Sequence, residues 1–313
     1  GEKMKKKLVL ILFLMIGAIV LLNQQTIVTY IMKNYLYKNE IVIPETDVTY
    51  KKDMNFSYVQ PVTEFEPHNK QDVLNIIYTI LNNGWDEFTF YCAEDYKNCT
   101  KEVSSIFKDQ STLSNLNNFI HPYHSYDILT ADITNLNKIT VHVERLYSKD
   151  QITEINTKID EIYNQLISED MSERDKILAI HDYIINNTIY DEELSNAILS
   201  GNDRDKNSNS HTAYGLLFEN KAICGGYADT MALFLDRMKI PNFKVSTYDH
   251  VWNAVQLEDG KWYHLDLTWD DPVTNTHEEM LTHTFFLLTT TQLQEQNTGQ
   301  HNFDTKIYSE LTE

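Results

Sequence analysis

Three short segments decide the fold of this chain. They are Cys224-Gly225-Gly226-Tyr227-Ala228, His250-Val251-Trp252-Asn253 and Trp262-Tyr263-His264-Leu265-Asp266. A thiol is a strong nucleophile when it is ionised, and a helix N-terminus and a nearby imidazolium both favour the thiolate. A carboxylate on the far side of the imidazole fixes its tautomer and orientation. Cys224, His250 and Asp266 are therefore the candidate catalytic residues.

The first segment is predicted to begin a helix at Cys224. The apolar residues that follow the thiol at helical spacing are Ala228, Met231, Leu235 and Met238. Gly225 and Gly226 would each cost roughly 1 kcal/mol inside a helix. In a first turn they cost less and let another backbone or a substrate approach the sulfur, so we place both glycines, with Trp252, at the substrate cleft. The alternative is that Cys224 is a small buried hydrophobic residue, and the His and Asp downstream argue against it.

The second and third segments must bring His250 and Asp266 to one face of a sheet. We expect three strands here, at residues 245–247, 250–257 and 261–268. Because side chains alternate along a strand, a two-residue Asp259-Gly260 turn would place His250 and Asp266 on opposite faces. A three-residue loop with Gly260 left-handed pairs Leu257 with Lys261 and places them on the same face. The catalytic interpretation therefore predicts the turn type.

The N-terminus carries a membrane-targeting pattern. Lys5-Lys6-Lys7 precedes an apolar run from Leu8 to Leu22. The run is short for a spanning helix, which needs about 20 residues, but Ile27 to Met32 extends it and no small-residue cleavage site follows it. We expect residues 1–32 to be an uncleaved signal-anchor of a single-pass protein of the cell membrane, with the catalytic part extracytoplasmic. The alternative is secretion after signal cleavage.

Cysteine usage indicates the compartment of the protein, and net charge limits its possible partners. Cys92 and Cys99 flank a polar loop, where they form either a small disulfide in an oxidising compartment or two unrelated thiols. Cys224 is left over, as expected of a reactive thiol. The net charge of −20 argues against nucleic-acid binding, which needs clustered Lys and Arg.

The remaining sequence suggests three parts behind the anchor. Residues 33–67 are predicted to be a stalk, residues 68–168 a small α/β domain without a catalytic motif, and residues 169–313 the catalytic domain. Within the small domain the patterns predict helices at 69–81, 103–119 and 152–166 and strands at 87–92 and 139–146. Ser172 is predicted to cap the next helix, on which we interpret His181 as a structural histidine. The polar stretch from Leu199 to Ser210 predicts a mobile loop that borders the site.

Together these motifs resemble the core of the transglutaminase-like superfamily. They are residues 224–228, Lys239-Ile240-Pro241, residues 250–253 and residues 261–271, and the resemblance covers roughly residues 172–290. It implies an α+β, papain-like fold in which a Cys-bearing helix packs on an antiparallel sheet that supplies His and Asp. It also implies that Cys224 is the nucleophile, that His250 is general base and then acid, and that Asp266 orients His250.

The resemblance implies a cysteine acyltransferase or amide hydrolase that acts through a thioester on protein or cell-wall peptides. Hydrolysis and cross-linking both stay open. Tyr190 is the candidate oxyanion donor beside the Cys224 backbone N–H, and a packing role is its alternative. No cofactor or metal is expected, because no oxygen-ligand loop for calcium is evident. The alternative function is an inactive scaffold that binds partners through a transglutaminase-like fold.

Overall fold

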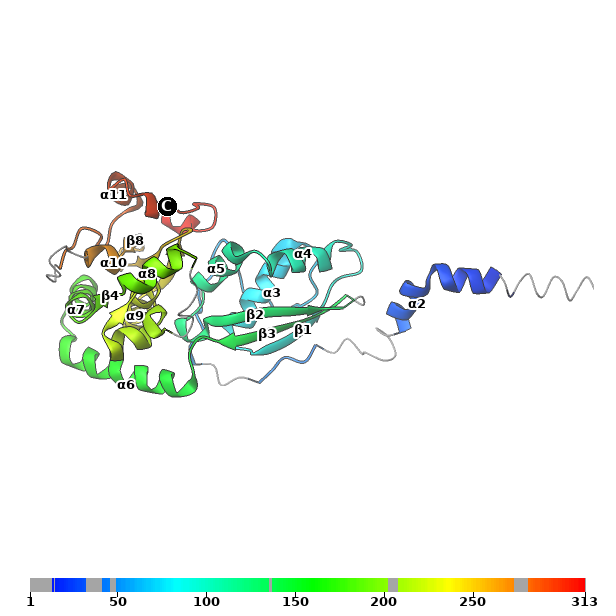
Figure 1. Cartoon of the computed structure of the whole chain (residues 1–313), viewed down its shortest axis with the longest axis horizontal. Helices are drawn as coiled ribbons and strands as arrows, with labels where there is room; N and C mark the ends of the chain where they lie inside the picture. The colour runs from blue at the N-terminus through cyan, green and yellow to red at the C-terminus, as the bar shows by residue number, and fades with distance from the viewer. Residues whose placement is uncertain are drawn as a thin grey trace, which may run out of the picture.

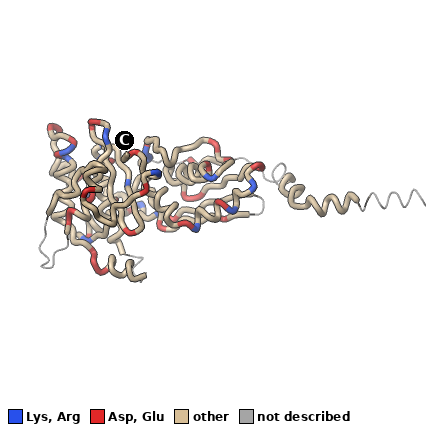
Figure 2. Tube along the Cα trace, turned by 90° about the horizontal axis from the view of Figure 1, so that it is seen from above, with Lys and Arg blue, Asp and Glu red and all other residues tan. Residues whose placement is uncertain are grey.

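The structure is a computed structural model that describes residues 13, 15–31, 41–45, 49–134, 137–201, 208–272 and 281–312. It is a mixed α/β protein with one three-stranded antiparallel sheet in each half (Figure 1). In Figure 2 the Lys and Arg residues are scattered among Asp and Glu along both halves.

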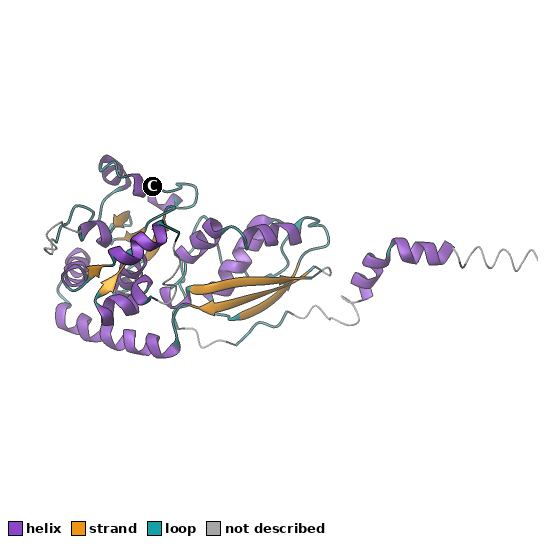
Figure 3. Ribbon diagram, viewed as in Figure 1, coloured by secondary structure: helices purple, strands orange, loops and turns teal. Residues whose placement is uncertain are grey.

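The first half packs three helices on one face of its sheet (Figure 3). The helices are α3 (Lys70–Asn82), α4 (Cys99–Ile106) and α5 (Gln110–Asn118); the strands are β1 (Glu87–Tyr91), β2 (Tyr126–Ile133) and β3 (Lys138–Arg145), in the order β1-β3-β2. Alternate residues Ile139, Val141 and Val143 of β3 are buried, as their period of two predicts. The predicted helix at 103–119 is instead two helices, because the Asp109 side chain accepts a hydrogen bond from the Thr112 N–H and caps α5.

A disulfide joins the end of β1 to the start of α4. Cys92 and Cys99 form this bond with their Cα atoms 6.0 Å apart, and both residues are buried. Cys224 is the free cysteine.

The segment predicted as a stalk does not stand apart from the fold. Residues 49–67 are largely irregular, but Phe56, Val59 and Phe65 are buried in the same core as α3 and β1. Burying these side chains removes a large apolar area from water, so this part of residues 33–67 belongs to the first half.

The N-terminal segment is described only in part. Residues 1–12, 14, 32–40 and 46–48 lie outside the described residues. Among the described ones, residues 15–22 are helical, and α2 (Gln24–Ile31) follows them. Among the residues that are described, no helix combines the length and apolarity needed to cross a membrane.

The second half builds a helical shell around the sheet β6-β7-β8. Its strands are β4 (Ile189–Tyr190), β5 (Lys221–Ala222), β6 (Asn242–Ser246), β7 (Val251–Gln256) and β8 (Trp262–Leu265). Its α-helices are α6 (Lys149–Leu166), α7 (Glu173–Asn186), α8 (Glu192–Leu199), α9 (Cys224–Arg237), α10 (Leu267–Asp270) and α11 (Thr290–Glu295). Short turns of other helix types include η2 (Pro122–His124), η3 (Asn209–His211), η4 (Gly215–Glu219), η5 (Gly299–His301) and η6 (Ser309–Thr312).

Helix α9 lies on β6 and β7, so the Cys-bearing helix packs on an antiparallel sheet as expected. Ser172 caps α7 by accepting from the Asp175 N–H. The last predicted strand, 261–268, ends earlier, because Asp266 caps the short helix α10 instead of continuing β8.

Two apolar cores meet at this sheet. Phe243, Val245 and Trp252 pack in the core of the first half, whereas Val255 and Leu265 pack in a second core with α7 and α9. Helix α6 contributes Ile155, Ile159 and Ile162 to the second core. Although α6 falls before residue 168 in sequence, its apolar face therefore belongs with the Cys-bearing half.

The β7–β8 hairpin has the register that the catalytic interpretation requires. Gln256 pairs with Trp262, Leu257 N–H donates to Lys261 O at 3.1 Å, and Gly260 has φ of 75°. The connection is therefore a three-residue loop, and the prediction of a left-handed Gly260 is confirmed.

Gly260→Val should destabilise this hairpin. A Cβ at Gly260 would meet no atom within 4 Å, so the penalty comes from positive φ, which a β-branched residue resists at about 1–2 kcal/mol. Gly260→Asn is the matched control, because Asn tolerates this region. Urea unfolding should show a lowered midpoint for valine and a near-normal one for asparagine. Equal midpoints for the two variants would show that the backbone angle does not hold the register.

Candidate active site

Cys224 occupies the first position of α9, against a short backbone segment. The N-cap Ile223 is extended and makes no side-chain capping bond. A Cβ on Gly225 would lie 3.0 Å from His211 O, and one on Gly226 would lie 2.8 Å from Ser210 O. The glycines thus let the η3 backbone lie directly on the helix start. The predicted loop at 199–210 therefore does border Cys224 at its described end, while residues 202–207 lie outside the described residues.

His250 and Asp266 meet beneath Cys224. His250 Nε2 lies 2.5 Å from Asp266 Oδ2, and the two side chains are 3% and 1% exposed. Cys224 hydrogen-bonds to the same imidazole and is itself half-buried. Because Asp266 occupies Nε2, the remaining ring nitrogen, Nδ1, is the one available to the thiol.

The electrostatics of the pair favour a charged imidazole. Burial alone would lower the pKa of His250, but the charge and hydrogen bond of Asp266, with a smaller contribution from Cys224, raise that pKa to about 10. Burial likewise opposes ionisation of Asp266, yet His250 and His301 hold the pKa of this carboxyl well below its usual range. An imidazolium beside a helix N-terminus is the environment that stabilises a thiolate.

His301 is a further member of the site that the sequence did not indicate. Its Nε2 lies 2.8 Å from Asp266 Oδ2, and the Thr298 hydroxyl bonds its Nδ1. With Thr298 donating to Nδ1, the ring carries its proton on Nε2 and donates to Asp266. His301 belongs to η5, an irregular segment 35 residues beyond Asp266, and no periodicity or motif there signals its role.

Trp252 backs the imidazole instead of lining an open cleft. It is 1% exposed and stacks on His250 with ring centroids 5.6 Å apart. Its Nε1–H donates to His264 Nδ1 at 3.0 Å. Burial lowers the pKa of His264 to about 3, which keeps that ring neutral and able to accept. Our placement of Trp252 at the substrate cleft is corrected accordingly.

Tyr190 lies near the thiol. It is in β4, paired with Ala222, two residues before Cys224. Burial first, and then the nearby Cys224 among other charges, raise its pKa. Its hydroxyl donates to Ser195 Oγ at 3.1 Å. An oxyanion role for Tyr190 stays a prediction.

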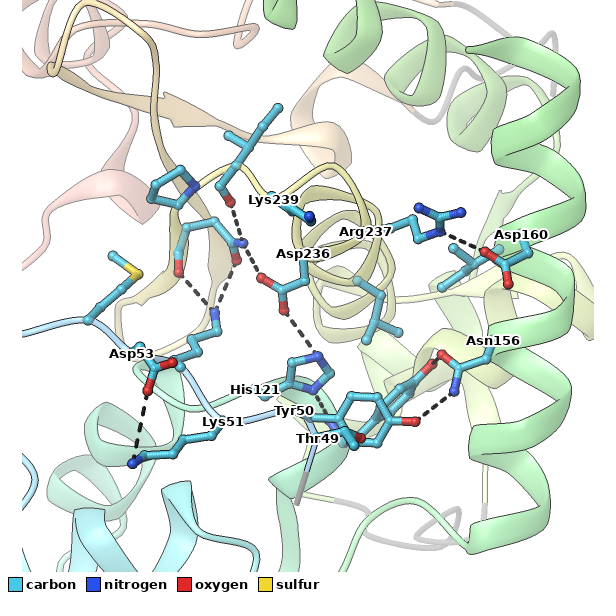
Figure 4. Close-up of a pocket in the computed structure, with 18 residues that line it drawn as sticks. Thr49, Tyr50, Lys51, Asp53, His121, Asn156, Asp160, Asp236, Arg237 and Lys239 are labelled. Atoms are coloured by element: carbon cyan, nitrogen blue, oxygen red, sulfur yellow. Dashed lines mark hydrogen bonds and ion pairs between the residues drawn. The ribbon is translucent and has the colours of Figure 1, made fainter. Parts of the chain in front are cut away.

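Two large cavities lined by described residues lie away from Cys224, toward the seam between the halves. One, of about 550 Å³, is lined by groups that pair with one another (Figure 4): His121 lies 3.2 Å from Asp236, and Arg237 donates to Asp160 at 2.6 Å. The other, of about 560 Å³, lies between Trp85, Arg145 and Tyr147. Neither is lined by Cys224, His250 or Asp266.

A thiol at a helix start, an imidazole from the adjoining sheet and a carboxylate behind it define the papain-like class of cysteine sites. Residues 160–267, about a third of the chain, match the family model described as the transglutaminase-like superfamily. The match includes Cys224, His250 and Asp266 and ends before His301.

Solved structures similar to this chain include a protein titled as a TGase (20% identity, TM-score 0.34), with 46% of this chain aligned to 44% of that chain. The periplasmic domain of TgpA from Pseudomonas aeruginosa bound to ethylmercury is also similar, at 17% identity and TM-score 0.19, over 42% of this chain and 55% of that chain. The chain thus spans about half the length of each of these solved chains. No curated protein matches it.

Alkylation should report the state of Cys224 directly. Because the other two cysteines are joined in a disulfide, iodoacetamide should add a single label to the unreduced protein. Its rate should stay high at mildly acidic pH and fall there in His250→Ala, since the imidazolium stabilises the thiolate. A wild-type rate that follows the titration of an ordinary thiol, near pH 8.5, would contradict the assigned site.

Proposed function

We propose that this protein is a membrane-anchored cysteine acyltransferase or amide hydrolase with Cys224, His250 and Asp266 as its catalytic residues. The observation that carries the proposal is the buried contact of 2.5 Å between His250 Nε2 and Asp266 Oδ2, beside the half-buried thiol of Cys224. Protein or cell-wall peptides that present a carboxamide are the proposed substrates.

The first half-reaction forms a thioester. The Cys224 thiolate attacks a carboxamide carbon, and the carbonyl electron pair moves to oxygen, where the Cys224 backbone N–H and the Tyr190 hydroxyl stabilise the oxyanion. The intermediate collapses, the C–N bond breaks, and the His250 imidazolium gives its proton to the departing amine. The acyl group is then bonded to Cys224 sulfur and His250 is neutral.

The second half-reaction releases Cys224. Neutral His250 takes a proton from an incoming amine or water as it attacks the thioester carbonyl. The C–S bond breaks and restores the thiolate and imidazolium. An amine yields a cross-linked amide and water yields the acid. Asp266 holds the ring in one orientation through both steps.

The proposed location is the outer face of the cell membrane, with residues 1–32 as the anchor. The three lysines before an apolar run support this orientation, and the Cys92–Cys99 disulfide suits an oxidising compartment. In intact cells, a membrane-impermeant maleimide should therefore label Cys224. Labelling only after lysis would contradict the location while leaving the chemistry open.

A screen of glutamine-containing and cell-wall peptides, with and without a primary amine, tests the activity. Cys224→Ala should abolish both ammonia release and amine incorporation. Asp266→Asn should reduce kcat by about 10³–10⁴-fold, because the imidazole loses its orienting charge. Asp95→Asn, at an exposed carboxylate that pairs with His68, is the matched control and should leave kcat unchanged. Turnover that survives Cys224→Ala would exclude the mechanism; an unreactive Cys224 without turnover would favour a binding scaffold.

The pH dependence of the free energy of unfolding should reveal the ion pair between His250 and Asp266. The folded pKa of His250, about 10, lies above its ordinary value of about 6.5. The contribution of charged His250 to the free energy of unfolding is therefore fully present below about pH 6.5 and is lost as pH rises toward 10. The difference in unfolding free energy between wild type and His250→Asn should shrink over that interval in denaturant titrations at successive pH values. A difference that grows from pH 7 to 10 would have the wrong sign.

A further inference from the structure

A second histidine–carboxylate group lies at the other end of α10 from Asp266. His181 and Asp182 come from α7, and His283 comes from the segment before α11. Asp182 Oδ1 lies 2.9 Å from His181 Nδ1 and 2.8 Å from His283 Nε2. These three residues, here called the His181 cluster, each present one potential ligand atom within 4.8 Å of the others.

Proton counting shows that a neutral His181 cannot satisfy both of its carboxylate contacts. The other nitrogen of His181, Nε2, lies 3.2 Å from Asp270 Oδ2, and both side chains are fully buried. A neutral imidazole has one N–H, so His181 can donate to only one of its two carboxylates. The remaining contact would set a nitrogen lone pair against a carboxylate oxygen. Either a second proton or a metal ion must lie between them.

We propose that the His181 cluster is a divalent transition-metal site, with Zn²⁺ as its ion. Two imidazole nitrogens and one carboxylate oxygen are ligands that suit Zn²⁺. Zn–ligand bonds of about 2.0–2.1 Å in a tetrahedron put the ligand atoms about 3.3 Å apart. The present contacts of 2.8 and 2.9 Å need to open by roughly 0.5 Å. Asp182 and His283 can move this far, since their side chains are 33% and 44% exposed.

The surroundings of His181 have the form of a metal site's outer shell. A ligating imidazole usually donates its other N–H to a carboxylate, which fixes its tautomer and strengthens it as a ligand. Asp270 occupies that position beside His181 Nε2. Asp270 is itself held by the Phe285 N–H at 2.9 Å and the Thr282 hydroxyl at 2.9 Å. His181 Nδ1 is thereby left as the lone-pair donor that points at Asp182 and His283.

An ion here would tie α7 to the chain that follows α10. The Phe286 ring packs edge-on against His181, with centroids 5.2 Å apart, and shields one side of the cluster. Three protein ligands leave one tetrahedral position for water. Because Asp270 ends the α10 helix that Asp266 begins, the ion would also steady the carboxylate that orients His250. Binding itself is independent of the proposed catalysis.

Metal binding to the full chain, purified in mild detergent and stripped with a chelator, tests the proposal. Zn²⁺ is titrated in competition with a chromogenic chelator, and Co²⁺ binding is followed by its visible absorption. Wild type should bind one equivalent, and Zn²⁺ should raise its unfolding midpoint. His283→Ala and Asp182→Asn should each weaken binding by more than about tenfold, since even outer partners of a metal contribute that much.

Two control variants separate this site from other histidines. His68→Ala removes an exposed imidazole that lies 3.0 Å from Asp95, the same pair chemistry without a second histidine, and should leave binding unchanged. His301→Ala removes a ligand from the other possible cluster, formed by His250, Asp266 and His301. Less than one equivalent in wild type, unchanged affinity in His283→Ala, or loss of binding in His301→Ala alone would each overturn the proposal.

Discussion

The candidate active site depends on the burial of one carboxylate. Asp266 is 1% exposed, and an ionised carboxylate out of water is unfavourable unless hydrogen bonds and opposite charge compensate it. Its Oδ2 receives His250 and His301, and its Oδ1 accepts the Trp269 N–H at 3.2 Å. Three segments must therefore converge on Asp266 before it can ionise: the residue directly before β7, helix α10 and η5. The same bonds hold the imidazole on which the thiol depends.

The length of the β7–β8 turn brings His250 and Asp266 to the same face of the sheet. A strand places successive side chains on opposite faces, so the number of residues in the turn decides whether His250 and Asp266 can meet. Gly260 at φ of 75° makes a three-residue loop possible. Asp266 then ends β8 and caps α10, which turns its carboxylate back toward the sheet. A local backbone angle thus fixes a contact between residues 16 positions apart.

Sequence reasoning predicted what local periodicity and parity control. The amphipathic helix at 69–81, the alternating strand at 139–146 and the hairpin register all follow from side-chain spacing, and the structure has each of them. Contacts formed by irregular chain were not predictable. His301 and His283 lie in segments without periodicity, and only the completed fold brings them to Asp266 and His181.

The prolines of residues 33–67 and the position of Trp252 led to two predictions that the structure corrects. The prolines of residues 33–67 suggested a stalk, yet Phe56 and Val59 are buried, because irregular chain can still bury aromatic and aliphatic side chains. Trp252 beside His250 suggested a cleft wall, yet its indole N–H needs a buried partner, and His264 provides one. In both cases a distant residue decided the environment.

The short helix α10 connects the two polar groups of the second half. Asp266 at its start holds His250, and Asp270 at its end holds His181. Neither carboxylate can shift alone, since four residues in one helical turn move as a unit and both ends are buried. A displacement of α7 at His181 would therefore reach the imidazole through α10, in addition to acting on α9 by direct packing. The contacts of His181 with Asp270 and of Asp266 with His250 carry this coupling. The geometry of Cys224 and His250 therefore depends on residues that touch neither.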